Sequence, residues 1–507
     1  MEQINFSEDK KTTKLETISR EELIKNYQII ESENLRLIRE NYELRNLQIT
    51  DEQLRLVTAE QLASLKAVLY GASSEKYKKP PKSEEKKKTP PEPRIKKLSE
   101  RYPNIPVVEV NLIINPVPNC EACGKQMSDS GMTEDSEQLT VIPKKYEITR
   151  FKRSIYRCSC QSCMKTAPAL PRIIEESTYS NEMIIDVVSS KYCDLIPMER
   201  YVQMAARGGL INLPPHSLID LTHKFAGFVK EVYRMIKTEV LSSRVLHGDE
   251  TPHRMLEGSD KKSWYLWGFS TPRLCFLECH STRSGDVASE ILITSSCEVL
   301  VTDVYSGYGK SVREVNLHRS KNKKVLLQSA NCNAHARRYF FKPLPNYPES
   351  EFYLDNYQKI YHLESQTKGK PVNEILELRS QMQEYFEQMR DKARETLDLY
   401  PIKNQFGKAL NYFLENYEGL TLFLTDADIP IDNNHQERLL RSHVVGRKTW
   451  YGTHSEQGAE TAAILFSIVE TCKLNDVNPR EYFKKLVQDI LARKPAYTPV
   501  EFKNQVV

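Results

Sequence analysis

The alternation of apolar and polar residues changes character at Arg244. Five short runs rich in β-branched and aromatic residues follow before residue 343, with turn-forming segments between most of them. In chain order they are RVLHGDET, SWYLWGFS, RLCFLECH, CEVLVTDVYS and KVLLQSANCNAH. Such runs, followed by segments with helical periodicity, predict an α/β core whose first part spans 244–342 and whose C-terminal helices span 426–507.

Helical periodicity dominates two further stretches of the chain. The charged segment EILELRSQMQEYFEQMRDKARETL belongs to 343–425, which we predict to be a helical insertion that contacts DNA or a second subunit. Residues 173–243 are also predicted to be helical. Within them, PMERYVQMAARGGLINLPPHSLIDL predicts two helices around Gly208-Gly209, either a DNA-reading helix-turn-helix or a generic helical hairpin.

An apolar residue recurs every seventh position near the N-terminus, at Leu23, Ile30, Leu37 and Leu44. This heptad predicts a coiled-coil (leucine-zipper) helix over 18–76 that joins copies of the chain into a homo-oligomer. The alternative is a lone amphipathic helix. The run KKPPKSEEKKKTPPEPRIKK then predicts a proline- and lysine-rich linker over 77–105, whose lysines either contact phosphates or are only solvated.

Composition limits which binding partners and which cellular compartment can be expected. The formal net charge is only +4, so any nucleic-acid binding must depend on local basic patches. The chain has no run of some 18 apolar residues, which argues against a membrane span. We therefore expect a cytoplasmic protein that associates with the nucleoid, and no membrane partner.

Five of the eleven cysteines cluster in one predicted domain, a zinc ribbon over 106–172. Tetrahedral Zn²⁺ needs four ligands, and C-x2-C pairs supply Cys120 with Cys123 and Cys160 with Cys163. Cys158 remains an alternative to Cys160. The site is expected to be structural, and the lysines and arginines that flank it suggest that the ribbon also faces DNA.

Three acidic residues carry the candidate chemistry. Asp249 and Asp303 belong to strand-like runs, and Glu437 lies on a helix-forming segment opened by Asp432-Asn433-Asn434. Carboxylates about 4 Å apart repel by roughly 4 kcal/mol at an effective dielectric of 20, so a cluster of three needs cations. Two divalent metals about 3.5 to 4 Å apart would compensate the charge and suit phosphodiester chemistry. The alternative is that the acids are solvated strand ends or helix caps.

The motifs that surround these acids resemble those of a known family. GASSEKY, the paired cysteines, LHGDET, TDVYSGY, CNAHARR and the long block that begins IDNNHQERLLRSHVVGRKTWYG occur in the order seen in transposases of the insertion sequence sixty-six family. The resemblance covers nearly the whole chain. It implies a DDE-type, ribonuclease-H-like catalytic core, with the acidic triad at Asp249, Asp303 and Glu437 and two Mg²⁺ ions per site.

The resemblance implies a DNA transposase that cuts transposon ends and transfers the freed 3′ hydroxyl to target DNA, with small companion proteins as an open possibility. Two alternatives remain, a purely hydrolytic ribonuclease-H-like nuclease and a non-enzymatic zinc-ribbon regulator. Cys332 and His335 form a C-x2-H pair that several DDE families share. Two ligands are too few for a separate zinc site, so we expect this pair to support the active site.

Several other side chains are candidates for DNA contacts or for roles beside the acids. Glu250 should point to the opposite sheet face from Asp249, and His247 either touches substrate or packs in the interior. Trp450 either stacks on an unpaired base or is a buried structural residue. The candidate DNA-binding residues are Arg337, Arg338, Arg438, Arg447, Lys448 and Trp450, with surface salt bridges the alternative for the first two.

Overall fold

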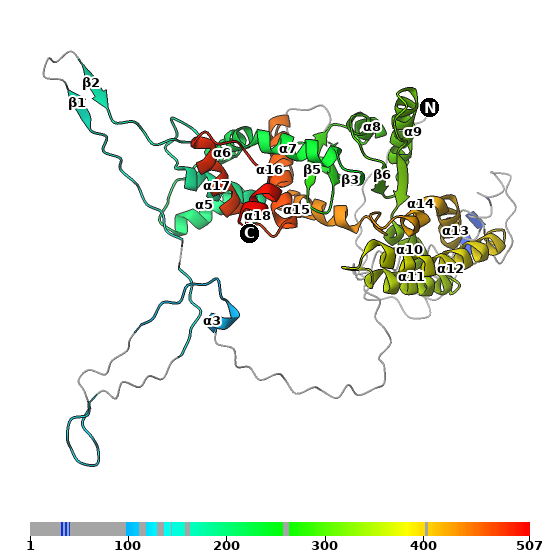
Figure 1. Cartoon of the computed structure of the whole chain (residues 1–507), viewed down its shortest axis with the longest axis horizontal. Helices are drawn as coiled ribbons and strands as arrows, with labels where there is room; N and C mark the ends of the chain where they lie inside the picture. The colour runs from blue at the N-terminus through cyan, green and yellow to red at the C-terminus, as the bar shows by residue number, and fades with distance from the viewer. Residues whose placement is uncertain are drawn as a thin grey trace. The chain divides into compact units, whose positions relative to one another are not determined.

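The computed structural model describes residues 98–110, 118–128, 136–142, 144–157, 163–256, 263–400 and 404–506, with five positions between 32 and 40. The chain forms two compact units. The larger unit contains a five-stranded sheet and most of the helices (Figure 1). The smaller unit includes the short helix α3 (Leu98–Arg101) and the turn that carries Cys120 and Cys123.

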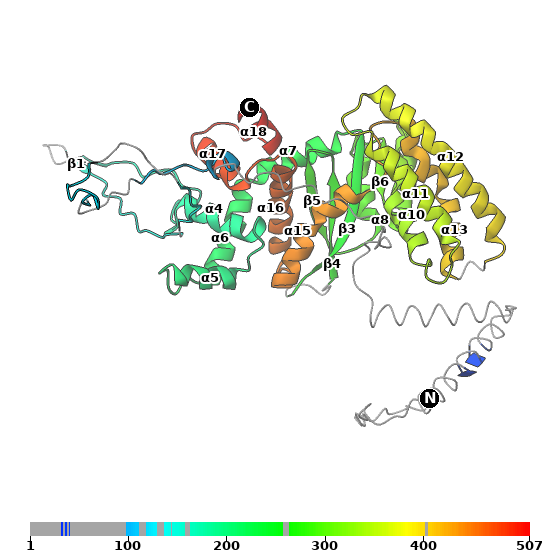
Figure 2. The same ribbon diagram turned by 90° about the horizontal axis from the view of Figure 1, so that it is seen from below.

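Each of the five strand-like runs forms one strand of a single mixed sheet (Figure 2). The strand order is β5-β4-β3-β6-β7, in which β3 pairs antiparallel with β4 and parallel with β6. The strands are β3 (Val245–Arg254), β4 (Ser263–Ser270), β5 (Cys275–His280), β6 (Val299–Thr302) and β7 (Gln328–Asn331). The prediction of an α/β core is therefore confirmed.

The two sheet faces are covered by different helices. Helices α8 (Gly285–Ile293) and α9 (Ser306–Lys321) cover the face to which Glu250 points, where Tyr308 packs edge-on against Trp267. Helix α15 (Asn434–Trp450) lies on the opposite face, where Gly268 leaves the space that the Gln436 side chain fills. Since a strand points successive side chains to opposite faces, Asp249 shares the face of α15.

The edge strand β5 is covered by helix α16 (Glu456–Leu474). The hydroxyls of Thr471 and Ser467 accept hydrogen bonds from the backbone amides of Cys275 and Leu277. Unpaired edge amides invite pairing with other chains, so these contacts close the sheet on this side. Because α16 lies against both the sheet and neighbouring helices, almost its whole length is buried.

Helices before and after the sheet pack together beside β5. The two helices predicted around Gly208-Gly209 are present as α5 and α6, and Gly209 takes the left-handed conformation that favours glycine. The full set is α4 (Asn181–Tyr192), α5 (Met198–Arg207), α6 (Pro215–Phe228), α7 (Lys230–Leu241), α17 (Pro479–Leu491) and α18 (Pro499–Val506).

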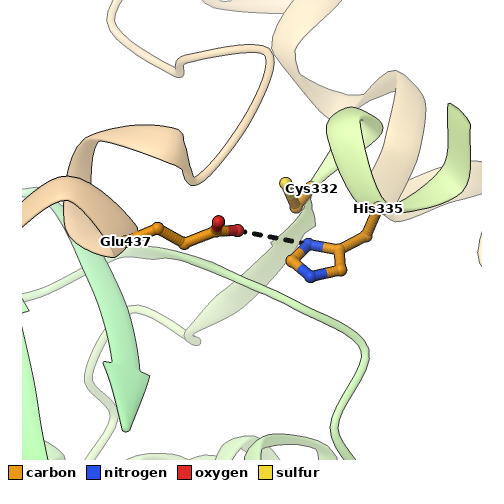
Figure 3. A group of neighbouring side chains, drawn as sticks. All are labelled: Cys332, His335 and Glu437. Carbon is orange, nitrogen blue, oxygen red and sulfur yellow. Dashed lines mark ion pairs between the residues drawn. The ribbon is translucent and has the colours of Figure 1, made fainter. Parts of the chain in front are cut away.

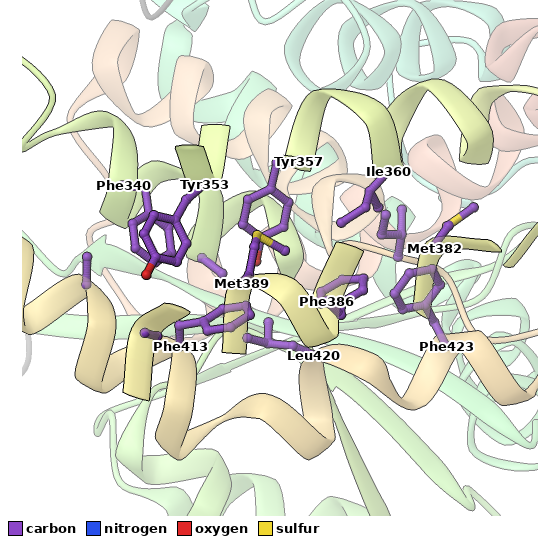
Figure 4. Packing of buried hydrophobic residues seen from close by; sticks show 14 of the residues in the cluster. Phe340, Tyr353, Tyr357, Ile360, Met382, Phe386, Met389, Phe413, Leu420 and Phe423 are labelled. Carbon is purple, nitrogen blue, oxygen red and sulfur yellow. The ribbon is translucent and has the colours of Figure 1, made fainter. Parts of the chain in front are cut away.

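The segment between β7 and α15 is helical, as predicted for the insertion. After α10 (Asn333–Phe341) it consists of α11 (Ser350–Ser365), α12 (Val372–Leu397), α13 (Gln405–Glu415), α14 (Tyr417–Thr421) and η2 (Leu422–Thr425). Its aromatic interior includes Phe340 stacked on Tyr353 at 4.1 Å between ring centroids (Figure 4). The same cluster includes Val299, Val301 and Ala330 of β6 and β7, so the insertion and the sheet share one hydrophobic core.

A buried arginine ties the insertion to the connector that leads into α15. The Arg379 side chain is 3% exposed and pairs with Glu364, with 2.6 Å between Nη2 and Oε1. Its Nη1 donates to the carbonyls of Phe423, Asp426 and Ile429. This one guanidinium therefore fixes the chain just before the segment that carries Glu437.

Two regions predicted from sequence are described only in part. Ser32, Glu33, Arg36, Leu37 and Glu40 are helical, and the rest of the predicted coiled coil lies outside the described residues. In the larger unit, β1 (Ile155–Arg157) pairs antiparallel with β2 (Met164–Thr166), which forms a hairpin within the predicted ribbon. Within the described ranges, no helix is long and apolar enough to cross a bilayer.

Replacing Arg379 with methionine should destabilise the larger unit by about 3–5 kcal/mol, because Glu364 and three buried carbonyls would lose their partner. Lys392→Met on the same helix is the control, since its pair with Glu395 is exposed and should contribute under about 1 kcal/mol. Thermal denaturation followed by circular dichroism measures both variants. Equal melting temperatures for the two would contradict this role of Arg379.

Candidate active site

Asp249 lies on β3, and Asp303 directly follows β6, the strand that pairs parallel with β3. The β3–β6 register ends at the pair His247 and Val301, two residues before Asp249 and Asp303. The β6–β7 register pairs Thr302 with Asn331, so the next residue, Cys332, follows beside Asp303. Adjacent strands are about 4.8 Å apart. Three sequence-predicted residues therefore meet at one level of the sheet.

Glu437 reaches this place from the first turns of α15. Asn433 precedes the helix as its N-cap residue, and the backbone amide of Glu437 donates to the Asn433 carbonyl at 3.3 Å. Asp432 stabilises the turn, since its carboxylate accepts hydrogen bonds from the backbone and side-chain nitrogens of Asn434. The run Asp432-Asn433-Asn434 thus opens the helix as the sequence predicts.

Asn433 joins the three segments that carry the candidate residues. Its Nδ2 donates to the carbonyl of Gly248 on β3, and its Oδ1 lies 2.8 Å from Nδ1 of His247. Its backbone amide donates to the Sγ atom of Cys332 at 3.2 Å. His247 is buried and bonded here, which matches the alternative of a packed histidine. No function was assigned to Asn433 from the sequence, although its position just before a predicted helix indicated a capping role.

The electrostatic state of Asp249 shows that the acids interact. Burial, together with the charges of Glu250, Asp303 and Glu437, raises the pKa of Asp249 to about 8. Glu250 points to the other face, where its carboxylate accepts hydrogen bonds from Arg283 and Tyr308. Since Glu250 is occupied by these partners, Asp249, Asp303 and Glu437 remain as the acids available to a ligand.

Glu437 faces His335 in this structure. Its Oε1 lies 3.6 Å from Nδ1 of His335, and Cys332 stands next to both (Figure 3). The ligand atoms of Cys332, His335 and Glu437 all lie within 4.8 Å of one another, and no other described residues form such a group of three or more. The charges of Asp303 and Glu437 act on Asp249, but neither aspartate belongs to this group of ligand atoms within 4.8 Å of one another.

The predicted DNA-binding residues fall into two sets. Arg438 is exposed one residue after Glu437, and Arg337 and Arg338 are half-buried on α10, beside His335. Lys448 is exposed farther along α15. The positions of these four allow phosphate contacts near the acids or along the helix.

Arg447 and Trp450 are both half-buried on α15. Burial lowers the pKa of both His253 and His443, and the charge of Arg447 acts in the same direction. The ring of Trp450 packs against Gly446, and Nζ of Lys191 on α4 lies 4.6 Å from its centroid. A cation already covers this ring, which favours the structural alternative over base stacking.

The cysteines of the predicted zinc ribbon are described in part. Cys120 and Cys123 occupy a tight turn in which the Cys120 amide donates to the carbonyl of Lys125 and Gly124 adopts a φ of 71°. The amides of Ala122 and Cys123 point at the Cys120 sulfur and lower its pKa. Cys163 precedes β2 and is exposed, whereas Cys158 and Cys160 lie outside the described residues. Zinc binding here stays a prediction.

Comparison with known proteins defines the class. A model of the IS66 transposase family matches residues 176–461, more than half of the chain. The matched segment includes the whole sheet and the helix that carries Glu437. The chain therefore belongs to the IS66 family of transposases.

Similar proteins occur in Sinorhizobium fredii (strain NBRC 101917 / NGR234). The uncharacterized protein y4hP is 23% identical over 75% of this chain and 71% of its own length. The uncharacterized protein y4jD is 25% identical over 77% of this chain and 78% of its own length. These similarities extend over most of each protein, beyond a single shared domain.

The clustered acids should make Asp249 a source of instability. Its folded carboxyl keeps a proton up to about pH 8, whereas the ordinary value is 3.8. The folded protein therefore binds more protons between these values and loses stability as pH rises. Asp249→Asn removes this loss, so its melting temperature should exceed that of the wild type by a margin that grows from pH 4 to pH 8.

Asp286→Asn is the matched control for this measurement. The pKa of Asp286 is lowered by Lys310 and Ser284, so its neutralisation should remove a favourable interaction and give no gain in stability. Differential scanning calorimetry of the three metal-free proteins at several pH values tests the sign. If the melting-temperature difference between Asp249→Asn and the wild type shrank toward pH 8, the raised pKa of Asp249 would be contradicted.

Proposed function

We propose that this transposase cleaves DNA at transposon ends and transfers the freed 3′ hydroxyl into target DNA, with Asp249, Asp303 and Glu437 as its catalytic acids. The observation that carries the proposal is that Asp249 on β3, Asp303 just after the neighbouring strand β6 and Glu437 on α15 are close enough for the charges of the other two to raise the pKa of Asp249. Membership of the IS66 family supports a transposase-type function independently of this geometry.

The strand order supports a ribonuclease-H-like core. Numbered from the first strand of the sheet, the order β5-β4-β3-β6-β7 is 3-2-1-4-5, with the second strand antiparallel to its neighbours. The first acid lies on the first strand and the second follows the fourth. A ribonuclease-H-like core, which the family resemblance implies, carries its first two acids at these places.

The donor set fits two Mg²⁺ ions. Mg²⁺ prefers carboxylate oxygens and keeps several waters, which suits half-buried acids better than an enclosed cage. Asp249, Asp303 and Glu437 would hold the ions, and their charges are mutually unfavourable without cations. When bound, the ions would supply an activated attacking oxygen and a stabilised leaving oxygen.

The remaining residues position the acids and the DNA. Asn433 holds β3, Cys332 and α15 in one arrangement, and Arg283 with Tyr308 holds Glu250 away from the reacting groups. Arg337, Arg338 and Arg438 would bind DNA phosphates near the acids, with Lys448 farther along α15. Such guanidinium donors suit phosphate oxygens because they are planar and always charged.

Three further elements belong to the same proposal. The cysteine ribbon would hold a structural Zn²⁺ through Cys120, Cys123, Cys163 and either Cys160 or Cys158. The N-terminal heptads would join copies of the chain into a homo-oligomer, as pairing of two transposon ends requires. Accessory proteins and nucleoid association remain expectations from the resemblance.

Neutralising one acid at a time tests the catalytic assignment. Asp249→Asn, Asp303→Asn and Glu437→Gln should each reduce Mg²⁺-dependent end cleavage by about a thousandfold or more, since each removes a charged ligand of the metal ions. End binding should persist in electrophoretic mobility shift assays. Asp286→Asn, an exposed carboxylate on α8, is the control and should cleave like the wild type.

The same assay separates the alternative functions. A supercoiled target plasmid added with pre-cleaved ends reports strand transfer, which a purely hydrolytic nuclease would not perform. Metal-dependent cleavage by the wild type would exclude a non-enzymatic regulator. Full cleavage by Asp249→Asn would refute the catalytic proposal.

A further inference from the structure

Two polar atoms face each other beside the catalytic acids without a hydrogen-bond partner. Nδ1 of His335 and Oε1 of Glu437 are both buried, and neither forms a hydrogen bond with any described residue. The 3.6 Å between them is too long for a hydrogen bond. Buried polar atoms are nearly always satisfied, so a facing pair of this kind needs an explanation.

The spacing of these atoms matches that of ligands around one small cation. In tetrahedral zinc sites with bonds of about 2.0 to 2.3 Å, neighbouring ligand atoms lie roughly 3.3 to 3.7 Å apart. The His335–Glu437 distance falls in this range, and the sulfur of Cys332 lies within 4.8 Å of a possible ligand atom of each residue. Figure 3 shows the three side chains converging from α10, its N-cap residue and α15.

Burial raises the pKa of the Cys332 thiol to about 12, so a thiolate here needs a bound cation beside it. Cys332 is fully buried, and its sulfur accepts a hydrogen bond from the Asn433 amide at 3.2 Å. The amide of His335 also points at the sulfur. Amide donors around a ligand atom orient it and tune the metal. Cys120 in the predicted ribbon has the same arrangement of two amides directed at its sulfur.

The ligand chemistry selects the class of metal. A thiolate and an imidazole favour Zn²⁺ over Mg²⁺, which takes oxygen ligands. Three protein ligands leave a fourth tetrahedral position open, as in zinc sites that bind water or a substrate oxygen. The sequence alone showed only Cys332 and His335, and the fold supplies Glu437 as the third ligand.

We propose that Cys332, His335 and Glu437 form a zinc site next to the two aspartates. Zinc bound through Oε1 of Glu437 leaves Oε2 for the site shared with Asp249 and Asp303, so one carboxylate would bridge two kinds of metal. Cys332 and His335 are then positioning residues for Glu437. The proposal goes beyond the proposed function, and zinc binding can be measured without DNA cleavage.

Zinc content of the full-length protein tests the site directly. After dialysis against metal-free buffer, inductively coupled plasma mass spectrometry should find one zinc equivalent fewer in Cys332→Ser and in His335→Gln than in the wild type. Zinc in the cysteine ribbon is common to all samples and cancels in the comparison. Cys297→Ser is the matched control, since Cys297 is equally buried and lies outside the group.

His335→Cys separates ligation from folding. It removes the same histidine as His335→Gln but provides a zinc ligand, so it should retain the equivalent that His335→Gln loses. Equal zinc in the wild type, Cys332→Ser and His335→Gln would overturn the proposal. A loss in His335→Gln that His335→Cys does not restore would overturn it as well, because the histidine would then act through structure alone.

Discussion

The active region depends on the hydrogen bonds of one asparagine. Asn433 binds the carbonyl of Gly248, the imidazole of His247 and the sulfur of Cys332, so it links the first strand, the start of α10 and the start of α15. Asp249, His335 and Glu437 each follow one of these contact points by a few residues. Because the contacts are buried, a shift of α15 would leave several polar groups unsatisfied at once. The hydrogen bonds of Asn433 that join α15 to β3 and to Cys332 therefore also fix the position of Glu437.

This arrangement places like charges together in a partly enclosed site. The cost is visible in the raised pKa of Asp249, which responds to burial and to three neighbouring carboxylates. Interactions elsewhere in the structure offset this unfavourable free energy. Arg283 and Tyr308 bind Glu250, and Arg379 anchors the connector before α15 from within the insertion. The helical insertion thus supports the site from a distance in addition to any contact with DNA or a second subunit.

Much of this architecture could be predicted from local sequence. β-Branched runs marked all five strands, and the polar run Asp432-Asn433-Asn434 marked the start of α15. Strand order and register could not be predicted, because they arise from pairing between distant segments. The convergence of Glu437 on Cys332 and His335 was hidden for the same reason, since more than a hundred residues separate them from it. The choice between base stacking and a structural role for Trp450 could not be made from residue type, because residue type does not report that Lys191 lies over its ring.

The central claim is that Asp249, Asp303 and Glu437 together hold a pair of divalent cations. Crystals of the full-length protein bound to a transposon-end DNA, grown with Mn²⁺ in place of Mg²⁺, would locate the ions by anomalous scattering. The account predicts two peaks about 3.5 to 4 Å apart, contacted by all three carboxylates and by a DNA phosphate. Manganese bound elsewhere, with the three carboxylates held apart around the DNA, would contradict it.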